Sequence, residues 1–203
     1  MKVVLHKGDL PAGMEFPNGV AIDTEAMGLK IGRDRLCLVQ LCGGDDVCHL
    51  VQIAPVPRAA PHLVRLLEDR TVLKIFHFAR FDVALLEKTF PCTVRPFYCT
   101  KLASKLVRTY TDRHGLKELC KSLLQVDLSK EEQTSDWGSE TLSPEQQRYA
   151  ATDVLHLHAL KKRLDAMMLR EEKVELLQAS FRGLAEILLL EQAGFEAESL
   201  FRH

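Results

Sequence analysis

The chain has 203 residues, of which 46 % are hydrophobic and 27 % charged. This length suits one well-buried domain and is short for two. The 27 basic and 28 acidic residues give a formal net charge of −1. Proteins that track long nucleic acids usually carry a basic excess, because their affinity comes largely from neutralising phosphates. Any nucleic-acid substrate is therefore expected to be short, or to be held by metal ions.

The composition also argues against a membrane or secreted protein. The longest apolar runs, such as "LAEILLL", fall well short of the roughly 20 residues of a membrane span. The start, "MKVVLHKGDLPAG", is too weak for a secretory signal. The six cysteines form no C-x-x-C pair and lack histidines at zinc-finger spacing, which disfavours disulfide and zinc readings. We expect reduced thiols, no membrane partner and a cytoplasmic location.

Strands come first along the chain. Apolar, β-branched runs bounded by turn residues predict three strands, at 19–25, 35–42 and 46–53. A turn-like "GGD" joins the last two. Apolar spacing then predicts a helix over 60–70, a buried strand over 71–78 and a helix over 79–90.

Helices dominate after a short extended piece near "TVRPFYC". They are predicted over 100–108, over 115–124 and in a long stretch from 144 onward. Ser143 and Pro144 give this last stretch an N-cap serine and a proline at its first position. A β-rich first third followed by alternating elements indicates an α/β fold, with a mixed sheet flanked by helices. No linker interrupts it, so 1–203 is expected to form a single domain.

Two acids interrupt the first predicted strand. Asp23 and Glu25, in "VAIDTEAMGL", are two positions apart, so their side chains project from the same face. Two buried carboxylates repel each other unless cations compensate them. The bland alternative is a solvated strand end, which would usually hold for an isolated D-x-E.

Two further acids change that balance. Asp82 lies among apolar residues near the start of a predicted helix, and Asp153 lies on the apolar face of the helix that begins at 144. Tyr149 is four residues before Asp153, so both share one helical face. Tyr149 alone would be read as a buried tyrosine with a satisfied hydroxyl. Four acids in buried contexts instead predict a metal site.

These motifs resemble the DEDD 3′-to-5′ exonucleases, in the subgroup whose third motif carries a tyrosine. Asp23 and Glu25 match the first motif, Asp82 with His77 five residues upstream matches the second as in ribonuclease D, and Tyr149 with Asp153 matches the third. The run "TSDWGSETLSPEQQRYAATDVLHLHAL" also resembles ribonuclease D.

The resemblance covers about 15–165 and has one visible departure. Glu140 and Thr141 replace the usual Arg-Pro, so any salt bridge or RNA contact made there is in doubt. A helical tail over about 166–203 leaves no room for the nucleic-acid-binding domains of ribonuclease D. "HFARFDVALL", "CTKLASKL" and "TYTDRHGLKE" resemble nanoRNase C, a short free-standing subfamily that acts on dinucleotides.

The resemblance implies a ribonuclease H-like fold with a mixed five-stranded sheet and a site for two divalent ions. Oxygen-only ligands favour Mg²⁺ or Mn²⁺. By similarity, Asp23 bridges both ions, Glu25 and Asp153 hold the ion that activates water, and Asp82 holds the second. Tyr149 orients the attacking water, since a phenol with a pKa of about 10 stays protonated near neutrality.

Substrate contacts are expected around the first two motifs. Met27 and Leu29 are candidates for an apolar wedge against a base, by resemblance to related enzymes, although a Met or Leu at a strand end is more often simply core. His77 is either a core histidine or a group near the 3′ end. The remaining candidates beside these motifs are Thr24, Gly28 and Phe78.

A basic stripe is predicted on the helix over 100–108. Lys101, Lys105 and Arg108 recur at helical spacing, and Arg113 and Lys117 follow closely. Such a stripe is usually a solvated face. An anionic substrate raises the alternative, in which the cluster captures a phosphate.

The sequence thus predicts a metal-dependent 3′-5′ exoribonuclease that converts dinucleotides to mononucleotides. Two alternatives stay open: a broader enzyme that trims structured RNA, and a catalytically silent RNA-binding protein on the same fold. The apolar tail "FRGLAEILLLEQAGF" either packs on its own domain or joins subunits. By resemblance, we expect a homo-oligomer, possibly an octamer.

Overall fold

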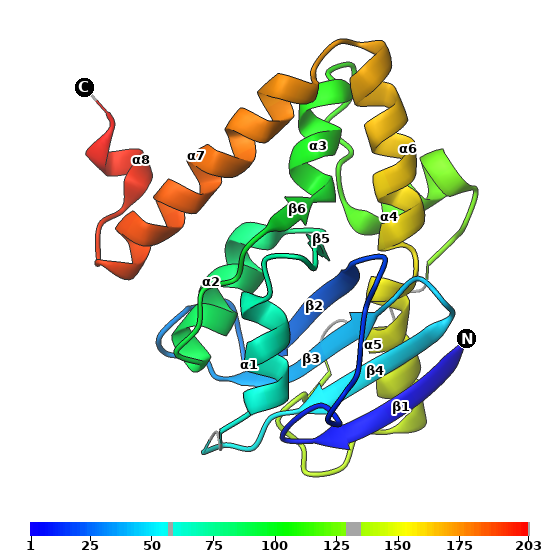
Figure 1. Ribbon diagram of the computed structural model, residues 1–203, viewed down its shortest axis with the longest axis vertical. Coiled ribbons are helices and arrows are strands. Elements are labelled where there is room, and N and C mark those ends of the chain that lie inside the picture. The colour runs from blue at the N-terminus through cyan, green and yellow to red at the C-terminus, as the bar shows by residue number, and fades with distance from the viewer. Residues whose placement is uncertain (57–58, 129–134, 203) are drawn as a thin grey trace.

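The computed structural model describes residues 1–56, 59–128 and 135–202. Within these residues the strands form one mixed sheet (Figure 1). The strands are β1 (Lys2–Lys7), β2 (Val20–Ala26), β3 (Leu36–Cys42), β4 (Val47–Gln52), β5 (Lys74–Phe76) and β6 (Phe97–Cys99). Their order is β1-β4-β3-β2-β5-β6, with β4-β3 and β3-β2 antiparallel and the other pairs parallel.

The mixed sheet flanked by helices is confirmed, but the described residues form six strands where five were predicted. The additional strand is β1, which lies at the sheet edge and pairs in parallel with β4. Its polar residues His6 and Lys7 mask the strand pattern in the sequence. Its partner lies more than 40 residues away, so no local turn reveals the pairing.

The helices follow the predicted order with four differences. The stretch from 144 onward is broken near His156, at 171–173 and near Ala193, and the segment over 115–124 is a short α-helix followed by a π-helical turn, η1 (Cys120–Leu124). The α-helices are α1 (Pro61–Glu68), α2 (Ala79–Thr89), α3 (Thr100–Val107), α4 (Leu116–Leu119), α5 (Pro144–Leu155), α6 (Leu157–Arg170), α7 (Val174–Gln192) and α8 (Ala197–Leu200).

The predicted cap of α5 is confirmed. The Ser143 hydroxyl accepts a hydrogen bond from the Gln146 backbone amide (3.1 Å), and the Gln146 side chain accepts one from the Ser143 amide (2.8 Å). Pro144 follows at the first helical position. This capping box fixes where α5 starts, and therefore which residues of the helix meet the sheet.

Helix α5 covers one face of the sheet and contacts β1, β4, β3 and β2. Helices α1 and α2 lie on the other face, in front of the sheet in Figure 1. Strand β5 is short and pairs only with Val20 and Ala21 of β2. Among the described residues, no strand pairs with the rest of that edge of β2, and Asp82 in the first turn of α2 contacts Thr24 there.

The C-terminal helices extend away from the sheet (Figure 1). One side of α7 packs on the domain through Leu177, Phe181 and Leu188, which are buried. Large apolar side chains that remain exposed include Leu189, Phe195, Leu200 and Phe201. The tail thus packs partly on its own domain and keeps an uncovered apolar side. No helix in the described part of the chain has both the length and the apolarity to cross a membrane.

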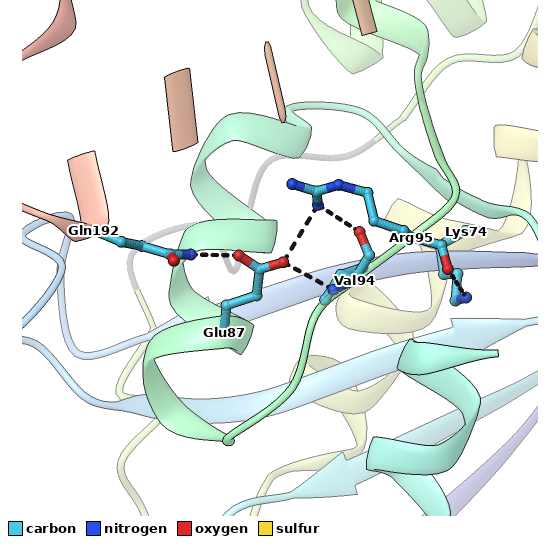
Figure 2. Close-up of polar contacts among 5 residues, drawn as sticks. All are labelled: Lys74, Glu87, Val94, Arg95 and Gln192. Atoms are coloured by element: carbon cyan, nitrogen blue, oxygen red, sulfur yellow. Dashed lines mark hydrogen bonds and ion pairs between the residues drawn. The ribbon is translucent and has the colours of Figure 1, made fainter. Parts of the chain in front are cut away.

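Polar contacts fasten α7 to α2 (Figure 2). The Glu87 carboxylate accepts hydrogen bonds from the Val94 amide (2.8 Å), from Arg95 (3.3 Å) and from the Gln192 side-chain amide. Near the start of α2, Arg80 donates to Glu191 (3.1 Å). Helix α2, which carries Asp82, is therefore held at both ends by the C-terminal segment.

Candidate active site

Three of the four predicted acids meet between β2 and α5. Asp23 and Glu25 project from one face of β2, and Asp153 reaches them from α5 on that same face. One carboxylate oxygen from each lies within 4.8 Å of the others. Strand alternation sets the first pair and helix placement brings the third, so three residues distant in sequence form one oxygen-rich group.

Asp82 lies beside this group and outside it. It is 3 % exposed in the first turn of α2, and its Oδ1 accepts a hydrogen bond from the Thr24 hydroxyl at 2.6 Å. Thr24 projects from the opposite face of β2 to Asp23 and Glu25. Burial raises the pKa of Asp82, and repulsion from Asp23 raises it further.

Burial and mutual repulsion make the ionised group unfavourable without cations. Burial raises the pKa of Asp23 to about 7. Burial, followed by repulsion from Asp23, Asp153 and Asp82, raises the pKa of Glu25 to about 9. The pKa values of Asp82 and Asp153 are also raised, chiefly by burial and then by Asp23.

This donor set fits divalent ions. In the part of the chain that the structure describes, no lysine or arginine forms an ion pair with any of the four carboxylates. Uncompensated carboxylates at this spacing are ligands for hard cations such as Mg²⁺ and Mn²⁺. The four carboxylates could therefore hold Mg²⁺ or Mn²⁺, whose positive charge would neutralise theirs.

Tyr149 lies one helical turn before Asp153 and interacts with its carboxylate. Burial, and then repulsion by Asp153, Glu25 and Asp23, raises the pKa of Tyr149 above its usual value. The phenol therefore stays protonated at neutral pH and is a hydrogen-bond donor in the site.

The S-D-W segment, residues 135–137, packs beside Tyr149 through Trp137. The Trp137 ring lies 6.1 Å from the Tyr149 ring, and Trp137 is 4 % exposed within a small core cluster. Asp136 accepts hydrogen bonds from Gly138 (2.9 Å) and Ser139 (3.0 Å), and its carbonyl accepts one from Gln146 (3.1 Å). These bonds tie the segment to the start of α5.

Glu140, at which the sequence departs from the ribonuclease D pattern, contacts two strands through its backbone. The Glu140 carbonyl accepts hydrogen bonds from Lys7 (3.0 Å) and from Gln52 (3.3 Å). Strands β1 and β4 thus hold this loop through its backbone, for which the side chain at 140 is not needed.

Met27 and Leu29 follow the first motif in a surface loop, where they are 55 % and 84 % exposed. Their apolar side chains are available to a ligand and are not core. Gly28 allows the Asp34 carboxylate to approach the backbone, because a Cβ at this position would lie 2.4 Å from an Asp34 carboxylate oxygen. A similar approach at Gly138, 2.5 Å from the Met27 sulfur, leaves room for the Met27 side chain.

His77 and Phe78 connect β5 to α2. His77 Nδ1 is 2.9 Å from the Thr100 hydroxyl, and its Nε2 is buried without a hydrogen-bond partner in the described residues. Burial, and then Lys101, lowers the pKa of His77 to about 3, so the ring is neutral. Phe78 is half exposed, and the Lys101 ammonium lies 4.2 Å from its ring centre.

The predicted basic stripe is wrong at Arg108. Helix α3 ends at Val107, and Arg108 turns inward until it is 5 % exposed. Its guanidinium donates to the Arg113 carbonyl (3.1 Å) and to the Ser122 hydroxyl (3.1 Å). Lys105 and Arg113 are exposed and Lys117 is partly buried. The sequence spacing could not show that η1 would supply a hydroxyl partner for Arg108.

Sequence reasoning assigned no role to Gln40. It pairs with Asp23 across β2 and β3, is fully buried, and its amide nitrogen lies 3.5 Å from an Asp23 oxygen. The signal was present, because Gln40 is the polar residue in the otherwise apolar "LCLVQLC". Trp137 also went unassigned, although its motif was noted.

Comparison with known proteins agrees with this geometry. A family model described as 3′-5′ exonuclease matches residues 12–169. Ribonuclease D of Gluconacetobacter diazotrophicus is 34 % identical over 167 residues, which are 82 % of this chain and 42 % of that protein. The chain thus spans less than half the length of this curated relative.

Solved structures of NrnC from Brucella melitensis match along the whole chain. The structure with bound Mg²⁺ is 46 % identical with a TM-score of 0.94 and covers 100 % of both chains. The structure bound to pGG is 46 % identical with a TM-score of 0.95, over 100 % of this chain and 99 % of that one. The expected ribonuclease H-like fold is confirmed by this likeness. The chain therefore belongs to the 3′-5′ exonuclease family, together with ribonuclease D and NrnC.

Proposed function

We propose that this chain is a two-metal-ion 3′-5′ exoribonuclease whose preferred substrates are dinucleotides. The observation that carries the proposal is the meeting of Asp23, Glu25 and Asp153 within 4.8 Å, with Tyr149 one turn away. The 46 % identity to NrnC, which has been solved with Mg²⁺ and with pGG, supports both the metal and the substrate class.

The four carboxylates would hold the ions. Asp23, Glu25 and Asp153 would hold the first, and Asp82, with Asp23, would hold the second. When bound, two divalent ions supply a nucleophilic water at neutral pH and neutralise the charge of the scissile phosphate. Without them, the raised carboxyl pKa values keep part of the group protonated.

The protein itself orients the reactants. Tyr149, held as a neutral donor, would direct the attacking water by a hydrogen bond, since proton abstraction by a phenol of raised pKa is unfavourable. Trp137 packs against the phenol and limits its movement. Such fixed placement of the nucleophile is a large part of catalysis by positioning.

Substrate length would be set by two groups around the acids. Exposed Met27 and Leu29 offer an apolar contact for a base, with His77 and Phe78 on the β5–α2 connection. The candidate cations come from one short segment of the chain and would form a compact set rather than an extended track: Lys101, Lys105, Arg113 and Lys117. A substrate with a leading phosphate and two nucleotides, such as the pGG bound to NrnC, suits this arrangement.

We also propose that the chain assembles into a homo-oligomer, in which the uncovered side of α7 and α8 meets another copy. Leu200 and Phe201 are 47 % and 66 % exposed near the end of the chain. Apolar side chains grouped in this way are typical of subunit interfaces. A closed ring of eight is the arrangement expected for short members of the family.

Direct assay of a labelled RNA tests the activity. A seven-residue RNA labelled at its 5′ end, mixed with the protein and Mn²⁺, should shorten one nucleotide at a time from the 3′ end, and EDTA should stop the reaction. RNA that binds without cleavage would indicate the silent alternative. Efficient trimming of structured RNA, with no gain on short substrates, would indicate the broader ribonuclease D-like enzyme.

A further inference from the structure

Thr24 lies between the two parts of the acid group. It is the middle residue of the D-x-E motif on β2, so its side chain points away from Asp23 and Glu25. The Thr24 hydroxyl donates to Asp82 Oδ1, in the first turn of α2, at 2.6 Å, and both side chains are buried. The residue that separates two acids of the group along the strand thus contacts the fourth.

The open edge of β2 makes this contact possible. Pairing with β5 stops at Ala21, so no strand of the described residues separates Thr24 from the first turn of α2. Thr24, in the strand, therefore contacts a carboxylate that approaches from a helix.

We propose that Thr24 is a positioning residue that holds Asp82 for the second metal ion. The hydrogen bond to Oδ1 orders the Asp82 carboxylate before an ion binds, so that less order would have to be gained on binding. This inference rests on the proposed two-metal function. Groups that orient metal ligands in this way commonly affect metal affinity by roughly 10- to 100-fold when removed.

The hydroxyl is poorly placed for the substrate contact that the sequence suggested. Thr24 is 7 % exposed, and its one hydroxyl proton is donated to Asp82. A substrate oxygen would have to break a short, charge-assisted bond to receive it. The assignment to Asp82 accounts for the burial of Thr24, whereas a substrate contact does not.

Two substitutions separate these roles. Thr24→Val removes the hydroxyl and keeps the branched shape that suits a strand, while Thr24→Ser keeps the donor. Titration calorimetry of the metal-free protein with Mn²⁺ measures affinity and stoichiometry without turnover. Circular dichroism checks folding, and kcat and KM are measured on a 5′-phosphorylated dinucleotide.

We expect Thr24→Val to weaken one of two Mn²⁺-binding events by about 10- to 100-fold and to lower kcat with KM little changed. Thr24→Ser should resemble the wild type. In an Asp82→Asn background the valine substitution should have no further effect on Mn²⁺ affinity, because the partner of the hydroxyl is already altered.

Unchanged Mn²⁺ binding in Thr24→Val, or a rise in KM alone, would overturn the role of Thr24 and leave the proposed enzyme intact. A wild-type protein that binds no Mn²⁺ would overturn both. If Thr24→Val does not fold, Thr24→Ala is the second test, and failure of both to fold would show that the hydroxyl serves the fold rather than the metal site.

Discussion

Asp23 and Asp153 approach each other from a strand and a helix. Burial raises the pKa of both, and repulsion by Asp23 raises that of Asp153 further. Replacing either by Asn should reduce turnover on the order of 1000-fold or more, since a bound ion contributes several kcal/mol to the reaction. The metal-free variant should be at least as stable as the wild type, because one repelling charge is gone.

The measurements are hydrolysis at saturating Mn²⁺ and thermal melts in EDTA. Asp46→Asn is a matched control, since Asp46 is exposed in the β3–β4 turn with a positive φ that Asn also tolerates. Near-wild-type turnover in Asp23→Asn or Asp153→Asn would contradict the two-metal assignment.

Glu25 gives a pH dependence of opposite sign to that of an ordinary paired carboxylate. Its pKa is about 9 in the folded protein and near its usual value of 4.5 when unfolded, so the folded state binds the extra proton. Stability of the metal-free protein is therefore lost as pH rises between these values, by at most about 1.4 kcal/mol per pH unit for this group.

Comparison with Glu25→Gln isolates this effect from other titrating groups, such as Lys74. The difference in unfolding free energy, wild type minus variant, should fall from pH 5 to pH 9 in EDTA. Saturating Mn²⁺ should remove that slope, because bound carboxylates are already deprotonated. Parallel stability curves for the two proteins in EDTA would show that Glu25 keeps an ordinary pKa.

Residue identity predicted the members of the acid group because a carboxylate in an apolar context demands compensation. Contacts between distant segments could not be read in the same way. Helical spacing predicted that Arg108 is a surface cation, but its guanidinium turns inward and donates to the Ser122 hydroxyl of η1. Thr24 carried no signal for its bond to Asp82, since that bond depends on the open edge of β2.

At the scale of elements, the segment around Trp137 determines how well α5 presents Tyr149. Trp137→Leu should destabilise the protein by roughly 1–3 kcal/mol and lower kcat about 10- to 100-fold, because small displacements of a positioning group have large effects on rate. The control is Phe181→Leu in α7, where the ring packs on Phe97 and Tyr98 and is not in contact with Tyr149.

Chemical denaturation measures the stability of both variants, and single-turnover hydrolysis measures the rate. Equal loss of stability with loss of rate only in Trp137→Leu supports the positioning role. Similar rates in the two variants would mean that Trp137 contributes to the fold alone.

Local sequence patterns predicted most helices and strands. They failed where contacts between distant segments determine where an element ends or whether it forms. The cap at Ser143 and Pro144 fixed the start of α5, because a capping box is encoded within four residues. The end of α5 near His156 was missed, since the apolar spacing continues into α6. Strand β1 was missed because its own sequence is short and half polar. It forms a strand by pairing with β4, which is distant in sequence.

At the scale of the whole molecule, the uncovered side of α7 and α8 predicts self-association. Light scattering at micromolar concentration should give a multiple of the chain mass, with eight copies as the expected number. Phe201→Asp should shift the protein toward smaller species, because a charge at an apolar interface must be desolvated.

The control is Val56→Asp, at a site that is 81 % exposed and distant in sequence from the tail. It should leave the mass unchanged. A wild-type monomer under these conditions would contradict the assembly.

The net charge of the chain is near zero, and its candidate phosphate-binding cations lie within one short segment, 101–117, which together predict a preference for short RNA. Counterion release rewards each phosphate contacted, so an enzyme for long RNA would spread its charge along the path. The decisive measurement is kcat/KM for 5′-phosphorylated RNA of two, three, five and seven residues, with and without the 5′ phosphate. The dinucleotide should be the best substrate and should lose most of its advantage without that phosphate. Equal efficiency at all lengths, or indifference to the phosphate, would contradict the account.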